Sequence, residues 1–256
     1  MNKLRIIVHL VNANGLQWFL LYLSERLLGK SSPYFFKKRM ALEISRGLPG
    51  FNTIEYNFKE WSNYDWSGQG EEWTESQEWK SALIEEIIKT YFKPGKIILE
   101  IGPGAGRWST ILAELSSQLI LVDMTEKAIE FCKQRLNTYS NCQFYMNNGS
   151  DISFLTDDSI DYVWSFDVFV HIAPRDSENY LKGLSRVLKK GGIGIIHHPA
   201  AGGFKGGFRS SMTNDVFCRL LTDYKFEVID QKDSWGKDNT FSLQEFQDKI
   251  TIFRKV

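Results

Sequence analysis

Cysteine and long apolar runs are both scarce in this chain of 256 residues. The cysteines number three and are spaced too widely for a disulfide framework or a metal-binding motif, so we predict a reducing cytoplasm. No metal ligands are predicted from a residue cluster, and metal dependence stays open, because Asp167 could join a cation site. The longest apolar run, Trp18–Leu23, is far too short to span a bilayer. Arg5 and His9 interrupt the N-terminal segment, and no signal peptide is therefore predicted.

The chain also lacks an excess of charge of either sign. Lysine plus arginine and aspartate plus glutamate each number 31, so no overall field favours nucleic acid as a partner. The charge is nevertheless uneven along the chain. Residues 1–50 hold eight basic residues against Glu25 and Glu43, a net charge of +6, which leaves −6 for the other 206 residues because the whole chain is neutral.

This basic N-terminal segment has helical periodicity. Within residues 1–30, one apolar helix stripe is predicted from Leu16, Phe19, Leu20, Leu23, Leu27 and Leu28. We therefore expect residues 1–50 to form a helical extension that serves as a lid, a contact in a homodimer, or a membrane-surface contact near anionic lipid. Gly47–Gly50 breaks the chain, and the main domain is predicted to occupy residues 51–256.

The main domain is organised around the stretch Lys96–Trp108. Its apolar run Ile97–Ile101 is typical of a buried parallel strand, and glycines follow at 102, 104 and 106 before a helix begins. Glycine permits the unusual φ angles of a tight turn and lets a ligand approach bare backbone. A strand, a glycine-rich loop and a helix in this order bind nucleotide-like ligands at the carboxyl edge of a doubly wound sheet.

Arg107 and Asp123 narrow the choice of ligand. A dinucleotide-binding loop needs a small residue at position 107, where arginine cannot pack. Asp123 ends a second apolar run, 17 residues after Gly106, and its carboxylate can accept hydrogen bonds from two ribose hydroxyls. The pattern E-x-G-x-G-x-G that starts at Glu100 resembles the first motif of the class I S-adenosylmethionine-dependent methyltransferases. The alternative is a plain turn at the glycines with Asp123 as a helix cap.

Strand and helix patterns alternate through the rest of the domain. Strands are predicted at 97–101, 118–123, 142–146, 161–165 and 193–199, with a terminal pair near 226–232 and 249–255. This order predicts an α/β fold, namely a Rossmann-like, doubly wound, seven-stranded and mostly parallel sheet with an N-terminal helical extension. Before the first strand, residues 56–74 are rich in aromatic residues without periodicity. We predict that Tyr64–Thr74 is a mobile cover over the ligand and that Thr74 caps the next helix.

From about Tyr64 to Val256 the chain resembles, more narrowly, a methyltransferase branch that O-methylates bacterial glycans and sugar-like natural products. This match is carried by Trp73, Asn147–Gly149, Ser165–His171, His197–His198 and Arg209–Met212. The resemblance implies S-adenosyl-L-methionine as the cofactor. It also implies cofactor contacts from Trp73, Glu100, Gly102, Gly104, Gly106, Asp123, Met124, Gly149, Ser150, Asp151, Ser165 and Phe166. A turn with capping roles is the alternative for residues 149–151.

The implied reaction assigns roles to the histidines of the cleft. A sugar hydroxyl is nearly neutral at pH 7, so its methylation benefits from a general base, and histidine has a suitable pKa. His171 follows the fourth predicted strand, and we predict that it is the base. Asp167 would orient it or hold an acceptor hydroxyl. The alternative role of His171 is to cap the helix that begins at Pro174.

The acceptor is predicted to contact His198 and Arg209. His198 ends the fifth predicted strand, and its alternative role is a histidine at the edge of the core that bonds to backbone. Arg209 would pair with a phosphate or carboxylate, or lie on a solvated loop. We expect a small-molecule, glycan or peptide acceptor. A carboxylate O-methyltransferase, which needs no base, and a non-catalytic cofactor-binding module of the same fold are the alternative functions.

Overall fold

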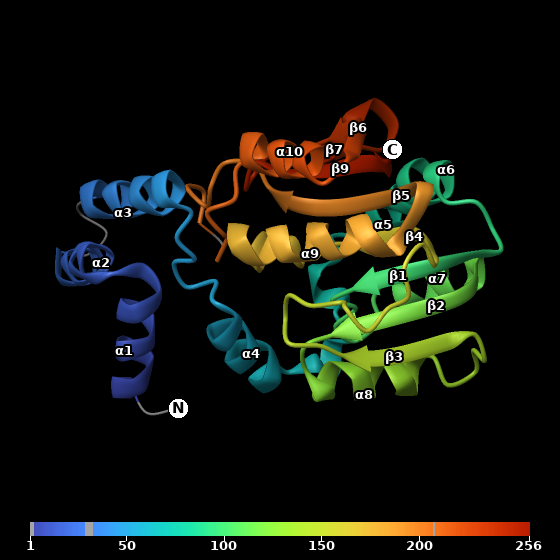
Figure 1. Ribbon diagram of the computed structural model, residues 1–256, viewed down its shortest axis with the longest axis horizontal. Coiled ribbons are helices and arrows are strands. Elements are labelled where there is room, and N and C mark those ends of the chain that lie inside the picture. The colour runs from blue at the N-terminus through green and yellow to red at the C-terminus, as the bar shows by residue number, and fades with distance from the viewer. Residues whose placement is uncertain (1–2, 29–32, 207) are drawn as a thin grey trace.

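The computed structural model describes residues 3–28, 33–206 and 208–256. At its centre lies a seven-stranded sheet in the order β3-β2-β1-β4-β5-β9-β6 (Figure 1). The strands are β1 Lys96–Ile101, β2 Ser116–Asp123, β3 Cys142–Met146, β4 Ile160–Ser165, β5 Leu188–Pro199, β6 Phe226–Lys232 and β9 Asp248–Lys255. Strands β1 to β5 are parallel, whereas β9 runs antiparallel to both β5 and β6. The predicted fold class is confirmed.

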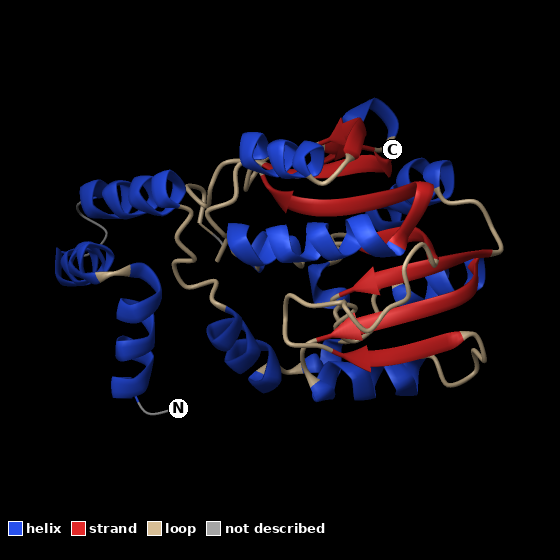
Figure 2. Cartoon of the chain, viewed as in Figure 1, coloured by secondary structure: helices blue, strands red, loops and turns tan. Residues whose placement is uncertain are grey.

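Helices cover both faces of this sheet (Figure 2). On β1, Leu99 and Ile101 belong to the core shared with α9 (Pro174–Val187) and α10 (Asn214–Asp223). Ile98 belongs to the core on the opposite face, shared with α5 (Gln77–Leu83), α7 (Ser109–Leu115) and α8 (Glu126–Arg135). The central strands are therefore buried on both faces, which explains why their apolar runs are continuous rather than alternating.

The helical extension predicted for residues 1–50 consists of three helices, which we call the N-terminal unit: α1 (Lys3–Asn14), α2 (Leu16–Leu28) and α3 (Pro33–Arg46). It lies to one side of the sheet (Figure 1). Gly15, whose φ is +84°, separates α1 from α2, so the predicted stripe on Leu16–Leu28 lies on α2. A small core of its own, built on Leu10, Trp18 and Leu42, holds the unit together.

Two local predictions before β1 are wrong. Residues 54–63, taken in part as aperiodic, form α4 (Ile54–Asn63), whose N-cap Thr53 accepts a hydrogen bond from the Tyr56 N–H. Thr74 does not cap α5, because its hydroxyl donates to Glu71, and the cap is Ser76, whose Oγ lies 3.0 Å from the Trp79 nitrogen. Beyond α5 the chain makes a wider turn at Ile84–Ile88 and a last turn, α6 (Lys89–Tyr91).

Between β6 and β9 the chain forms a hairpin of β7 (Ser234–Trp235) and β8 (Phe241–Ser242), which the sequence did not reveal. The indole nitrogen of Trp235 donates to the Trp79 carbonyl oxygen at 3.1 Å and so fastens the hairpin to α5. Among the described residues, none of the helices is both long and apolar enough to cross a bilayer.

Candidate active site

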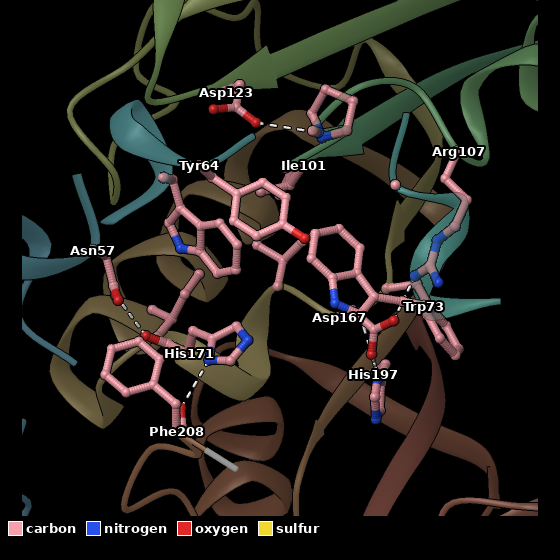
Figure 3. A pocket seen from close by; sticks show the side chains of 18 of the residues that line it. Asn57, Tyr64, Trp73, Ile101, Arg107, Asp123, Asp167, His171, His197 and Phe208 are labelled. Carbon is pink, nitrogen blue, oxygen red and sulfur yellow. Dashed lines mark hydrogen bonds and ion pairs between the residues drawn. The ribbon is translucent and has the colours of Figure 1, made fainter. Parts of the chain in front are cut away.

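A cavity of about 640 Å³ opens at the carboxyl ends of the parallel strands. Ile101–Ala105, Val122–Met124 and Phe166–Val168, which end or follow β1, β2 and β4, line it, and α4 covers it. Figure 3 shows side chains of these elements pointing into one space. A volume of this size is ordinary for a small-molecule or cofactor site, and a parallel α/β sheet places such a site at this edge.

The glycine-rich loop after β1 brings bare backbone to this cavity. Gly102 and Gly104 line it, with φ angles of +69° and +56°. A Cβ on Gly102 would lie 2.5 Å from Cγ2 of Val168, and one on Gly104 would lie 2.7 Å from Cζ3 of Trp66. Both positions therefore exclude side chains, as a close approach to backbone requires. Gly106, with φ of +86°, turns the chain toward α7 and does not line the cavity.

Asp123 is the last residue of β2 and lines the cavity beside this loop. Its Oδ1 accepts from the Thr125 N–H at 2.9 Å, and its Oδ2 accepts from the Gly104 N–H at 3.3 Å. Burial raises the pKa of the carboxyl, and these hydrogen bonds oppose the rise. A carboxylate fixed in this way can accept hydrogen bonds from hydroxyls of a ligand on the loop, so the residues present fit a nucleoside-containing cofactor.

The structure divides the other predicted cofactor residues into two groups. Trp73, Met124, Gly149 and Phe166 line the cavity. The rest do not, and they are Glu100, Gly106, Ser150, Asp151 and Ser165.

Members of the second group have structural contacts instead. The Ser109 hydroxyl donates to Glu100 at 2.6 Å beneath the glycine loop, and the Ser165 hydroxyl donates to the Ile101 carbonyl oxygen at 2.9 Å, between neighbouring strands. Asp151 is exposed and bonds to Ser153.

An aromatic cluster from α4 and the following turns covers the cavity. It consists of Trp61, Tyr64, Trp66 and Trp73. Tyr64 stacks on Trp73 with ring centroids 5.1 Å apart, and Trp66 packs edge-on to Tyr64 at 4.9 Å. The predicted cover over the ligand thus lies against the glycine loop; its mobility stays a prediction.

His171 lies in a short turn, Phe169–His171, after β4. Its Nδ1 is 2.8 Å from the Phe208 carbonyl oxygen. Because a carbonyl only accepts hydrogen bonds, Nδ1 carries the proton and Nε2 keeps a lone pair. Burial lowers the pKa of the imidazole to about 4, so the ring is neutral at pH 7. The turn does not cap α9, because the N-cap of that helix is Ala173.

Asp167 does not orient His171, so the first of its two predicted roles is wrong, and the second, holding an acceptor hydroxyl, stays a prediction. Its carboxylate pairs with Arg107 through Oδ2, and Oδ1 lies 3.0 Å from Nδ1 of His197 (Figure 3). The guanidinium of Arg107 and the imidazole of His197 hold the pKa of this carboxyl well below its usual range, although burial opposes them. Asp167 has φ of +60°, a conformation that its place in this network maintains.

The two adjacent histidines of β5 point to opposite faces, as successive strand residues do. His197 lines the cavity between Asp167 and Asp248, whose carboxylates raise its pKa against the effect of burial. His198 is fully buried, bonds to Thr251 Oγ1 at 2.7 Å and stacks on Phe217. The predicted acceptor contact of His198 therefore does not fit its position, because the ring lies in the core.

Arg209 lines the cavity, and its predicted contact with the acceptor stays a prediction. Its Nε donates to Asp248 Oδ2 at 2.8 Å, and its guanidinium lies 4.1 Å from the centroid of the Phe246 ring. Arg107 and Arg209 thus end one buried chain of charges that runs through Asp167, His197 and Asp248.

The cavity lining includes residues that were not predicted as site residues, among them Arg107, Asn52 and Asn57. Arg107 is buried and lies over the rings of Trp108 and Phe166; a charged residue directly after the glycine motif was the signal available for it. Asn52, just before α4, and Asn57, on α4, left no signal, because α4 was not predicted. Asn57 Nδ2 donates to the His171 carbonyl oxygen at 2.6 Å, and Asn52 Nδ2 donates to that of Arg209 at 3.3 Å.

This chain is similar to known methyltransferases in both sequence and structure. Residues 98–192 match a family described as "Methyltransferase domain". An S-adenosylmethionine-dependent methyltransferase from Methanosarcina mazei is 18% identical, with a TM-score of 0.54 over 66% of this chain and 97% of that one. The geranyl diphosphate C-methyltransferase of Streptomyces coelicolor A3(2) is 14% identical, with a TM-score of 0.59 over 79% of this chain and 98% of that one.

A third similar structure is a TehB-like S-adenosylmethionine-dependent methyltransferase from Corynebacterium glutamicum, 21% identical with a TM-score of 0.53 over 67% of this chain and 86% of that one. At these identities the structures establish a shared fold, and the family match establishes the domain. The family match agrees with the predicted enzyme class, a methyltransferase. Residues 98–192 thus match a methyltransferase domain, and the chain has the fold of the class I S-adenosylmethionine-dependent methyltransferases.

Proposed function

We propose that this protein transfers the methyl group of S-adenosyl-L-methionine to a hydroxyl of a sugar, a glycan or a sugar-like natural product. The observation that carries this proposal is the state of His171, a neutral imidazole at the cavity whose Nδ1–H is held by the Phe208 carbonyl oxygen. Such a ring offers Nε2 as a proton acceptor. A hydroxyl loses its proton when it is methylated and so benefits from a base, whereas a carboxylate is already deprotonated at pH 7.

The cofactor is expected on the loop Gly102–Ala105, with its ribose hydroxyls donating to Asp123. Its sulfonium carries an activated methyl group, so the residues of the chain have to align the acceptor and exclude water. The aromatic cluster of Trp61, Tyr64, Trp66 and Trp73 would shield the reacting groups from water. His171 receives the hydroxyl proton as the oxygen attacks, and its neutrality avoids a second cation beside the sulfonium.

Two amide oxygens favour a hydroxyl over a carboxylate as the acceptor. Asn52 and Asn57 both line the cavity, and each directs its Nδ2 to a main-chain carbonyl oxygen, while its Oδ1 is buried. Within residues 3–28, 33–206 and 208–256, neither Oδ1 has a hydrogen-bond partner. If these side chains turn when the acceptor binds, a polyol can donate hydrogen bonds to the two oxygens, while a carboxylate has no proton to give at pH 7. Leaving them unsatisfied costs free energy.

The test is a turnover assay with S-adenosyl-L-methionine and two acceptor panels, one of neutral and nucleotide-linked sugars and one of small carboxylic acids. Formation of S-adenosylhomocysteine together with a methyl ether that survives mild base supports the proposal. A base-labile methyl ester would establish the carboxylate alternative. Asn57→Leu should raise the acceptor KM without changing cofactor affinity, whereas Asn63→Leu, an exposed change at the end of α4, should leave both unchanged.

A further inference from the structure

The outward surface of the N-terminal unit is apolar on two of its helices. On α2, Leu16, Leu20, Leu23 and Leu27 recur at intervals of four and three residues, which places them on one stripe. Their exposed fractions run from 38% to 84%. On α1, Ile7 and Val8 are 41% and 50% exposed. Leucine-rich surface of this extent is unusual on a soluble monomer and marks an interaction site.

The folding of the unit does not account for this stripe. Both helices already bury a different face, where Leu10 of α1 and Trp18 of α2 pack with Leu42 of α3. The exposed leucines are therefore additional to the apolar residues that the small core uses. A second apolar face on a helix that is already packed requires another contact to bury it.

The exposed charges of the N-terminal unit have one sign. The unit has two acidic residues, Glu25 and Glu43, and both pair with the buried Arg39. Its outward charges are consequently basic, and they come from Arg5, Arg26, Lys37, Lys38 and Arg46, all of which are exposed.

These observations favour a lipid bilayer over a second copy of the chain as the partner that covers this surface. In a two-fold symmetric dimer, the same basic surface of each copy would face its equivalent, so like charges would meet. An anionic bilayer instead has an apolar interior that can bury the leucines, and its negative headgroups attract the lysines and arginines. We propose that the N-terminal unit docks this protein on anionic lipid membranes, with α1 and α2 lying in the interface and the basic residues on the headgroups.

The unit is also fastened to the wall of the cavity. Asn14 and Gly50 exchange two hydrogen bonds, at 2.9 and 2.7 Å, and His9 Nε2 lies 2.9 Å from Oγ1 of Thr53, the N-cap of α4. Because α4 lines the cavity, docking of the unit would hold the cavity close to the membrane surface. An acceptor carried by a lipid could then reach the site without leaving the bilayer.

The experiment is co-sedimentation of the full chain with vesicles of phosphatidylcholine alone and with vesicles containing phosphatidylserine. We expect binding to the anionic vesicles that is at least about tenfold stronger and that weakens with salt. Leu20→Glu/Leu23→Glu and Lys37→Glu/Lys38→Glu should each abolish most of it. Val256→Glu, which changes an exposed apolar residue outside the unit, and Lys133→Glu/Lys182→Glu, on α8 and α9, should bind like the native chain.

All these substitutions are on the surface, and circular dichroism and thermal unfolding will show whether each variant folds like the native chain. If the native chain does not bind anionic vesicles, or if the leucine variant binds them as well as the control, the proposal is wrong. A dimer in analytical ultracentrifugation that Leu20→Glu/Leu23→Glu dissociates, with no vesicle binding by the native chain, would assign the surface to a second copy instead.

Discussion

The imidazole of His171 is held by the main-chain carbonyl oxygen of Phe208, 2.8 Å from Nδ1, and not by a carboxylate. The two residues come from different loops, one after β4 and one before α10. A carbonyl fixes the tautomer as firmly as a carboxylate but adds no negative charge to raise the pKa of the ring. Burial therefore dominates and brings that pKa to about 4.

The first prediction concerns the proposed base. His171→Ala should lower kcat by roughly 10²–10⁴-fold with cofactor affinity little changed. Because the folded pKa is about 4, the native ring stays neutral at every pH above that value, so activity should be flat between about pH 5 and 8. This differs from the value near 6.5 expected for an unperturbed imidazole. A pH–rate profile measures it, and an acid limb near 6.5 that His171→Ala removes would contradict the burial argument.

His198→Asn is the matched contrast on β5. Because His198 bonds to Thr251 and stacks on Phe217 in the core, its loss should lower the free energy of unfolding by about 1–3 kcal/mol. Cofactor affinity and the acceptor KM, measured below the unfolding transition, should be unchanged. A raised acceptor KM in a stable His198→Asn variant would restore the original acceptor assignment.

The second prediction concerns Asp123. Asp123→Ala removes the acceptor of the proposed ribose hydrogen bonds, each worth about 1.5–3 kcal/mol, so the Kd for S-adenosyl-L-methionine should rise roughly tenfold to 100-fold or more. Isothermal titration calorimetry measures this. Asp151→Ala is the control, because Asp151 is exposed and lies outside the cavity lining. Equal affinities for the native chain and Asp123→Ala would remove Asp123 from the cofactor site.

The third prediction concerns the aromatic cover. Trp66 lies directly on Gly104, the backbone that the cofactor is expected to approach, so the segment from Tyr64 to Thr74 should move when the cofactor binds. Hydrogen exchange of this segment should change on addition of S-adenosylhomocysteine, and Trp66→Ala should accelerate cofactor association in stopped-flow fluorescence. Exchange that is equally slow with and without ligand would mean that the segment is a fixed wall.

The fourth prediction concerns Glu100, which is 2% exposed and accepts a hydrogen bond from Ser109. Burial raises its pKa from 4.5 to about 7. The folded state therefore keeps a proton that the unfolded state releases, and this contribution to stability is lost as the pH rises from 4.5 to 7. Glu100→Gln should remove that loss, worth about 3 kcal/mol.

Urea unfolding at pH 5 and pH 8, followed by tryptophan fluorescence, checks the Glu100 prediction. The variant should gain stability relative to the native chain as the pH rises. Parallel stabilities of the two proteins at both pH values would show that Glu100 is ionised in the folded state across this range.

The sequence alone determined the features that depend on local chemistry. The apolar run Ile97–Ile101, the glycines of the following loop and the acid Asp123 predicted a strand, a turn and a ligand contact, because each constraint acts within a few residues. The alternation of such segments then predicted the fold class, while the order of the strands in the sheet came from the structure. The prediction of methyl transfer rested on the resemblance of this motif to a known family and not on the contacts of any side chain.

Tertiary structure alone decided which side chains meet. The sequence places His197 and His198 at one strand end, but the choice between them depends on which face of β5 turns to the cavity. Likewise, Asp167 pairs with Arg107, which lies 60 residues away in the chain, so no local pattern could predict this ion pair. These contacts form only when separate strands and loops pack together. The direction in which a loop side chain points depends on that packing, so no local sequence pattern predicts it.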